Sequence, residues 1–153
     1  MRGIIILFAL IGCSFSSHSQ LTKCSKKLIG TWEYRFRDGF EKWTAENDVL
    51  IGSAYRVNKV GDTTKVEDLQ IKKINKSFVY SIKTKVAVAD SLTIESYNFV
   101  GTKKKMIFYN IDSNIPTMIS YTFGFLNRNK LKISIQYGVK DEPVVLILSR
   151  SKE

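Results

Sequence analysis

Two glutamates, Glu41 and Glu67, are the residues of this chain best suited to chemistry, because each lies among aromatic and aliphatic residues. Two carboxyl groups whose environments separate their pKa values can serve as acid and base in the hydrolysis of glycosides or lipids. The same groups can instead orient a small ligand inside an apolar cavity. Nothing in their spacing requires catalysis, so we expect a binding protein that is not an enzyme and assign no catalytic residue. A carboxylate-based hydrolase is the weakest alternative.

Other catalytic and metal-binding chemistry has little support in the sequence. The single histidine is His18, close to the start of the chain, and the cysteines are Cys13 and Cys24. The chain contains no Gly-x-Ser-x-Gly motif, no glycine-rich phosphate loop and no cluster with metal-ligand spacing. We therefore predict no metal site and no cofactor, and we expect Cys24 to be a packed thiol or, as an alternative, a reactive one.

Strand-like alternation dominates the chain after residue 30. In the first such segment Trp32, Tyr34 and Phe36 share one face, while charged residues share the other. Further segments follow at a spacing of roughly 8–12 residues, which is typical of an antiparallel barrel or sandwich. They are 40–45, 49–57, 64–74, 78–82, 92–99, 106–110, 118–123, 131–137 and 144–149. We predict an all-β, up-and-down, lipocalin-like barrel of eight to ten strands with a short N-terminal helix around residues 21–28; a two-sheet sandwich is the alternative.

The parity of these strands selects a candidate ligand site inside the barrel. Glu41 shares a face with Trp43, Tyr55 shares a face with Ile51, and Glu67 shares a face with Leu69. If the apolar member of each pair points inward, its partner also lines the interior. The candidate ligand-binding residues are therefore Glu41, Trp43, Tyr55 and Glu67. The alternative is that the polar residues lie at the mouth of the barrel or pair with neighbouring lysines.

The first residues are typical of an export signal, with Arg2 followed by a short apolar run from Ile4 to Ile11. Small residues before Gln20 predict a signal peptide over residues 1–19 and a single domain over residues 20–153. Alternatively, Leu10-Ile11-Gly12-Cys13 matches a lipobox, with a leader of residues 1–12 and a lipidated Cys13. The apolar run is shorter than the ~20 residues of a spanning helix, and no later segment is longer, so we predict no transmembrane segment in the mature chain. The expected location is the periplasm or the exterior, or the outer membrane for a lipoprotein.

The charge is strongly basic, with 24 Lys and Arg against 14 Asp and Glu, for a net charge of +10. Loss of Arg2 with the leader leaves 23 − 14 = +9. Such a charge favours acidic partners, for example anionic lipid or glycan in the cell envelope. Because the basic residues are dispersed and the chain carries an export signal, we predict no nucleic-acid partner. Solvated strand edges and turns are the alternative explanation of the lysines.

A Gly-x-Trp motif, Gly30 to Trp32, opens the first strand and resembles the motif found at this place in lipocalins. In that superfamily a basic residue near the end of the last strand often covers the tryptophan and closes the barrel. The resemblance implies that Arg150 has this role here. A guanidinium over an indole ring is worth ~0.5–2 kcal/mol, so we expect Trp32 and Arg150 to form the structural closure of the barrel.

The chain more closely resembles a family of uncharacterised lipocalin-like domains from exported bacterial proteins of the Bacteroidetes type. The matching motifs cover nearly the whole mature chain; they are Leu28 to Trp32, Glu41-Lys42-Trp43, Gly52 to Tyr55, Gly61-Asp62-Thr63, Glu67 to Ile71, Phe108, Asn110 and Pro116. Ser113 and Asn114 stand where the family has His and Asp, so any role of that pair is changed here. The resemblance implies the fold but no activity.

These observations lead to one expected function and one alternative of a different class. We expect binding of a small apolar or amphipathic molecule in the cell envelope, in a cavity of ~300 Å³ or more. The alternative is a structural or interaction protein of the envelope that uses its basic surface on anionic lipid or glycan.

Overall fold

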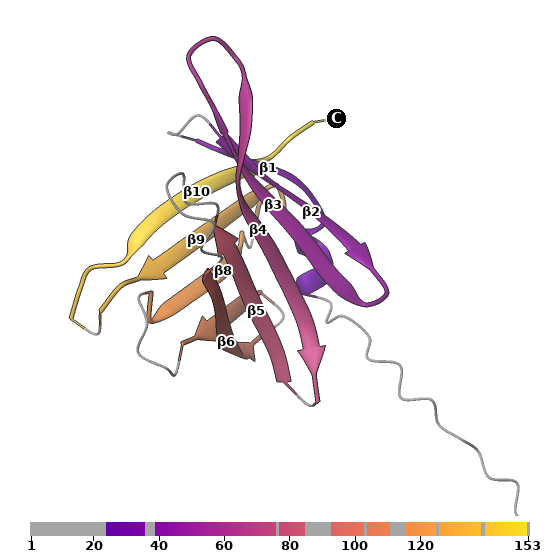
Figure 1. The fold of residues 1–153 in the computed structure, drawn as a ribbon, viewed down its shortest axis with the longest axis vertical. Helices are drawn as coiled ribbons and strands as arrows, with labels where there is room; N and C mark the ends of the chain where they lie inside the picture. The colour runs from indigo at the N-terminus through magenta and orange to yellow at the C-terminus, as the bar shows by residue number, and fades with distance from the viewer. Residues whose placement is uncertain are drawn as a thin grey trace, which may run out of the picture.

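The computed structural model describes residues 24–35, 39–75, 77–84, 93–102, 104–110, 116–124, 126–138 and 140–152. The predicted leader, with both processing sites, Cys13 and His18, lies outside these residues. The described part contains a single 3-10 turn, η1 (Ser25–Leu28), followed by β-strands (Figure 1). The strands are β1 (Gly30–Tyr34), β2 (Gly39–Glu46), β3 (Val49–Val57), β4 (Thr63–Ile74), β5 (Ser77–Thr84), β6 (Thr93–Gly101), β7 (Lys105–Tyr109), β8 (Met118–Phe123), β9 (Lys130–Gln136) and β10 (Val144–Arg150).

The ten strands form one closed antiparallel barrel. Each strand pairs with its neighbours in sequence, and β1 closes the circle by pairing with β10. This arrangement confirms the predicted all-β, up-and-down barrel and excludes the two-sheet sandwich. Of the predicted N-terminal helix around residues 21–28, the described part contains the 3-10 turn η1, which ends just before β1 begins at Gly30, and residues 21–23 lie outside the described residues.

Alternating burial along the strands builds the core, but on β3 the inward face is the opposite of the one that we predicted. Leu50, Gly52 and Ala54 are buried there, whereas Ile51 is 36% exposed. The reason lies across the strand pair, where Gly52 is the register partner of Trp43. The buried indole of Trp43 occupies the space over Gly52, so the face with the small residues must point inward.

Alanine at Gly52 is expected to destabilise the barrel by roughly 1–3 kcal/mol, the usual cost of overpacking a core. An added Cβ would lie 2.7 Å from the Cδ2 and Cε3 atoms of Trp43, closer than packed atoms approach. The indole would have to move against its buried neighbours. Urea unfolding of Gly52→Ala measures the loss, and Ser53→Ala, on the outward face of the same strand, should leave stability within about 0.5 kcal/mol of the parent.

One end of the barrel is closed by Trp32, which is fully buried. Its Nε1 donates a hydrogen bond to the carbonyl of Leu28 at 2.7 Å, which holds η1 under the barrel. The Arg150 guanidinium carbon lies 4.3 Å from the centroid of the Trp32 ring, so the predicted pair is present. Arg150 also donates hydrogen bonds to the carbonyls of Ile29, at 2.6 Å, and Lys27, at 2.7 Å. We call this end the closed end.

Cys24, just before η1, is buried and is a free thiol. Burial raises its pKa, and the nearby Lys27 opposes that shift. The geometry agrees with a packed thiol, because the thiolate form that reacts is disfavoured. No helix in the described part of the chain is long and apolar enough to cross a membrane.

Candidate functional site

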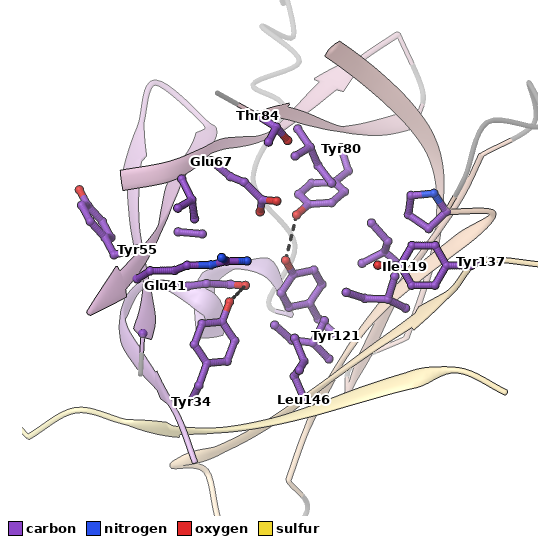
Figure 2. Close-up of a pocket in the computed structure, with 18 residues that line it drawn as sticks. Tyr34, Glu41, Tyr55, Glu67, Tyr80, Thr84, Ile119, Tyr121, Tyr137 and Leu146 are labelled. Atoms are coloured by element: carbon purple, nitrogen blue, oxygen red, sulfur yellow. Dashed lines mark hydrogen bonds between the residues drawn. The ribbon is translucent and has the colours of Figure 1, made fainter. Parts of the chain in front are cut away.

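A cavity of about 340 Å³ opens at the end of the barrel opposite Trp32. The residues that line it come from eight of the ten strands and from two connections (Figure 2). They lie on β1 to β5 and on β8 to β10, mostly toward the strand ends at this rim, together with Pro116 before β8 and Tyr137 after β9. Because these strand ends meet at one rim of an up-and-down barrel, we call this rim the open end.

The lining of the cavity is divided into a polar wall and an apolar wall. Its charged residues, Glu41, Arg56 and Glu67, stand on β2, β3 and β4. The facing wall, on β8 to β10, supplies aliphatic side chains. These are Ile119, Ile133, Ile135 and Leu146. In Figure 2, Glu41 and Glu67 lie across the cavity from Ile119 and Leu146. This lining suits a molecule with one polar and one apolar side.

Strand register explains why the two glutamates share this wall. Glu41 on β2 is the register partner of Ala54 on β3, and Ala54 is in turn the partner of Glu67 on β4. The three residues form one row across the inner surface, with neighbouring strands spaced ~4.8 Å apart. The small Ala54 side chain therefore leaves room between the two carboxyl groups.

Glu41 is held in place by two hydrogen bonds, one to each carboxyl oxygen. Trp43 Nε1 donates to Oε2 at 2.8 Å, and the Tyr34 hydroxyl donates to Oε1 at 3.0 Å. Trp43 is two residues along the same strand and so shares its inward face, while Tyr34 comes from the neighbouring β1. The Glu41 side chain is thus rigidly oriented at the base of the cavity, where it is only 5% exposed.

Burial makes the charged form of Glu41 costly. Desolvation raises the pKa of its carboxyl group to about 7, and the nearby Glu67 adds to the rise. The hydrogen bonds from Trp43 and Tyr34 oppose the shift, because they stabilise the carboxylate. Near neutral pH the cavity therefore contains a group that readily takes up or releases a proton.

Two tyrosines form the floor of the cavity beside Glu41. The hydroxyls of Tyr80 on β5 and Tyr121 on β8 are 3.0 Å apart and share a hydrogen bond across the barrel. Below them the rings of Trp43 and Phe108 pack edge-on to the Tyr121 ring, at centroid distances of 6.1 and 6.5 Å. Burial raises the pKa of both tyrosines well above 10, so they remain neutral donors and acceptors.

The four ligand-binding residues predicted from strand parity differ in where they lie relative to the cavity. Glu41 and Glu67 both line the cavity, and in Figure 2 both carboxyl groups point toward its centre. Trp43 lies in the core beneath it and holds Glu41. The prediction that the Tyr55 side chain lines the interior is wrong: Tyr55 borders the cavity, but its ring points away from the centre and stacks on Phe40 at 4.7 Å. The cause is the reversed face of β3.

Sequence reasoning missed several lining residues, among them Tyr34, Arg56, Tyr80 and Tyr121. Tyr34 and Tyr121 stand on strands with clear alternation, so the same parity argument, applied to every strand, would have found them. Arg56 was missed because the inward face of β3 was predicted the wrong way round: Arg56 has the same parity on the strand as the buried Gly52 and Ala54. The register shift beside Ala54 places an extra residue, Val66, on β4 and leaves the alternation of β3 unbroken.

Within the described ranges, no group of three or more His, Cys, Asp or Glu residues is placed to hold a metal ion. No known family model and no curated protein matches the chain. The class of protein is therefore defined by the fold and the cavity alone. It is an antiparallel β-barrel that is closed at one end and has, at the other end, a small cavity with one polar and one apolar wall.

Proposed function

We propose that the protein is a lipocalin-like binding protein of the cell envelope, exported by its leader, that holds a small amphipathic molecule without converting it. The observation that carries the proposal is the cavity of about 340 Å³, which lies within the size range of small-molecule sites, roughly 300–1,000 Å³. A barrel closed at one end by a packed tryptophan and hollow at the other is a suitable container for one ligand.

The two walls of the cavity indicate how the ligand lies. Its apolar part packs on the β8 to β10 wall, where Ile119 and Leu146 are exposed to the cavity. Its polar part faces Glu41 and Glu67. Each Glu41 oxygen already accepts one hydrogen bond and has a second acceptor position. A ligand that presents an N–H or O–H group at this point satisfies that position, so we infer a ligand with a donor at its polar end.

Filling the cavity is expected to abolish binding. In Leu146→Trp the larger ring would extend from β10 into the cavity and occupy the space for the apolar part of the ligand. We expect at least a tenfold rise in Kd, about 1.4 kcal/mol, for N-phenyl-1-naphthylamine, a small apolar probe with one N–H donor. The probe's fluorescence on titration with the exported, processed protein gives the Kd.

The matched control is Ile147→Trp, the next residue on the same strand, which alternation places on the outer face. It should leave the Kd of the probe within about twofold of the parent. Equal binding by the parent and Leu146→Trp would contradict the proposal, provided that urea unfolding shows both proteins to be folded. Native mass spectrometry of the same preparation identifies any co-purified ligand. It also separates a chain that begins at Gln20 from one lipidated at Cys13.

A further inference from the structure

The closed end of the barrel is strongly basic. The loops and turns at this end are η1, the β2–β3, β4–β5, β6–β7 and β8–β9 connections, and the residues after β10. The exposed basic residues there, which we call the basic end, are Lys26, Lys27, Lys73, Lys104, Arg128 and Lys152. Among the residues described at this end, the acidic ones are Glu46, Asp48 and Glu33, and the carboxylate of Glu33 accepts a hydrogen bond from Ser151 Oγ at 2.6 Å. At the open end Asp62, Asp141 and Glu142 are interspersed with the lysines, so the positive charge is concentrated at one end of the molecule.

The β8–β9 hairpin presents an apolar side chain in the middle of this charge. Leu126 is 94% exposed. Residues on either side of it are hydrogen-bonded: Gly124 N donates to Lys130 O at 3.0 Å and Asn129 N donates to the Asn127 side-chain oxygen at 2.9 Å. A single exposed leucine is ordinary on a protein surface. A leucine exposed in a strand connection two residues from a cation, here Arg128, is suited to insertion into an apolar phase.

Contacts along the hairpin place basic residues on both of its sides. Phe123 N donates to the carbonyl of Lys104 at 2.9 Å, which joins the hairpin to the β6–β7 turn. The Lys27 ammonium lies 5.9 Å from the centroid of the Phe123 ring, which joins the hairpin to η1. Basic residues of three separate elements, η1, the β6–β7 turn and the β8–β9 connection, are therefore gathered at this end of the barrel.

From this arrangement we propose that the closed end is a docking surface for anionic lipid bilayers, with Leu126 inserted among the acyl chains and the basic end on the lipid head groups. Each lysine or arginine near an anionic bilayer increases the affinity of a protein for that bilayer. An apolar side chain inserted among the acyl chains adds the free energy of burying its surface. This orientation points the cavity mouth away from the membrane. The proposal does not depend on what the cavity binds.

Co-sedimentation of the exported, processed protein with vesicles tests the proposal. We expect stronger binding to vesicles of phosphatidylcholine mixed with phosphatidylglycerol than to phosphatidylcholine alone, and weaker binding as salt rises. Leu126→Ser should weaken the partition about tenfold. Val60→Ser is the matched control, because Val60 is 83% exposed in the β3–β4 turn at the open end and should change nothing.

Two pairs of charge substitutions separate the two ends. The double variant Lys27→Gln, Arg128→Gln, at the closed end, should weaken vesicle binding by about tenfold or more. The double variant Lys59→Gln, Lys140→Gln, at the open end, should weaken it by less than about twofold. A Leu126→Trp variant should show a blue-shifted emission with anionic vesicles and quenching by brominated lipid, and Val60→Trp neither. Equal effects of the two charge pairs, equal binding to neutral vesicles, or an unshifted Leu126→Trp in a bound protein would each overturn the proposal. Capture on dextran sulfate without any vesicle binding would overturn it in favour of a glycan partner.

Discussion

Alanine at Gly30 is expected to lower the free energy of unfolding by about 4 kcal/mol, from two independent causes. Gly30 has φ of +118°, a conformation that L side chains rarely adopt, and holding another residue there costs about 1–3 kcal/mol. In addition, an alanine Cβ would lie 2.5 Å from an Nη atom of Arg150, which forces that side chain to move.

The second cause depends on what that Arg150 atom contacts. It is the nitrogen that donates to the Ile29 carbonyl, and the same guanidinium lies over the Trp32 ring. A displaced Arg150 loses charge-assisted hydrogen bonds, each worth roughly 1.5–3 kcal/mol, and uncovers the indole. The closed end of the barrel would therefore loosen as a unit. Urea unfolding followed by tryptophan fluorescence measures the loss.

Gly61→Ala is the matched control for Gly30→Ala. Gly61 also has a positive φ, +94°, but nothing lies within 4 Å of the position of an added Cβ. It should therefore show the backbone cost alone, and Gly30→Ala should be less stable than Gly61→Ala by about 2 kcal/mol. If the two variants lose the same stability, Arg150 is not constrained as we describe.

Strands with one clearly apolar face follow the bounds predicted from the sequence most closely. The bounds of β3 and β8 coincide with the predicted segments, and the other strands differ from them by a few residues at the ends. The closure by Trp32 and Arg150 could also be predicted, because a family resemblance and a physical reason pointed to the same pair. These features depend on local alternation or on a short motif, and both can be recognised in a short stretch of sequence.

The errors arise where the deciding contact is between strands. On β3 both faces carry apolar residues, so alternation alone did not select Leu50, Gly52 and Ala54 as the inward set. The selection comes from the Trp43 indole on the next strand, which only a residue without a side chain can face. The same reversal turned the Tyr55 ring outward and kept Arg56, on the opposite face, out of the predicted site. The volume of the cavity likewise depends on how all the strands pack.

Glu41 should make the protein less stable at neutral pH than in mild acid. Its carboxyl group has a pKa of about 7 in the folded protein, chiefly because of burial, against the ordinary value of 4.5 expected for a solvent-exposed glutamate in the unfolded chain. Between these two values the folded state binds a proton that the unfolded state lacks, so the free energy of unfolding falls as pH rises. The stabilisation is complete below pH 4.5 and is lost as pH rises through about 7. One pKa unit corresponds to about 1.4 kcal/mol, so the total loss is about 3 kcal/mol.

Glu41→Gln is expected to remove this dependence. The amide stays neutral at every pH, and it can accept from Trp43 Nε1 and donate to the Tyr34 oxygen, so both hydrogen-bond partners remain satisfied. The variant should match the parent near pH 4.5 and exceed its stability by about 2 kcal/mol or more at pH 8. The pKa values of Cys24, Lys65, Tyr80 and Tyr121 are raised from ordinary values that already lie above this window, so these groups do not contribute to the dependence.

Urea midpoints and slopes measured at intervals from pH 4.5 to pH 8 give the two stability profiles. Glu46→Gln, a change at an exposed strand end, is the control and should run parallel to the parent over the whole range. Parallel profiles for the parent and Glu41→Gln would mean that the Glu41 carboxyl group is more hydrated than its burial implies. A gain at pH 8 that disappears at pH 4.5 would instead show that this barrel retains, at a cost in stability, a carboxyl group whose burial serves the cavity and not the fold.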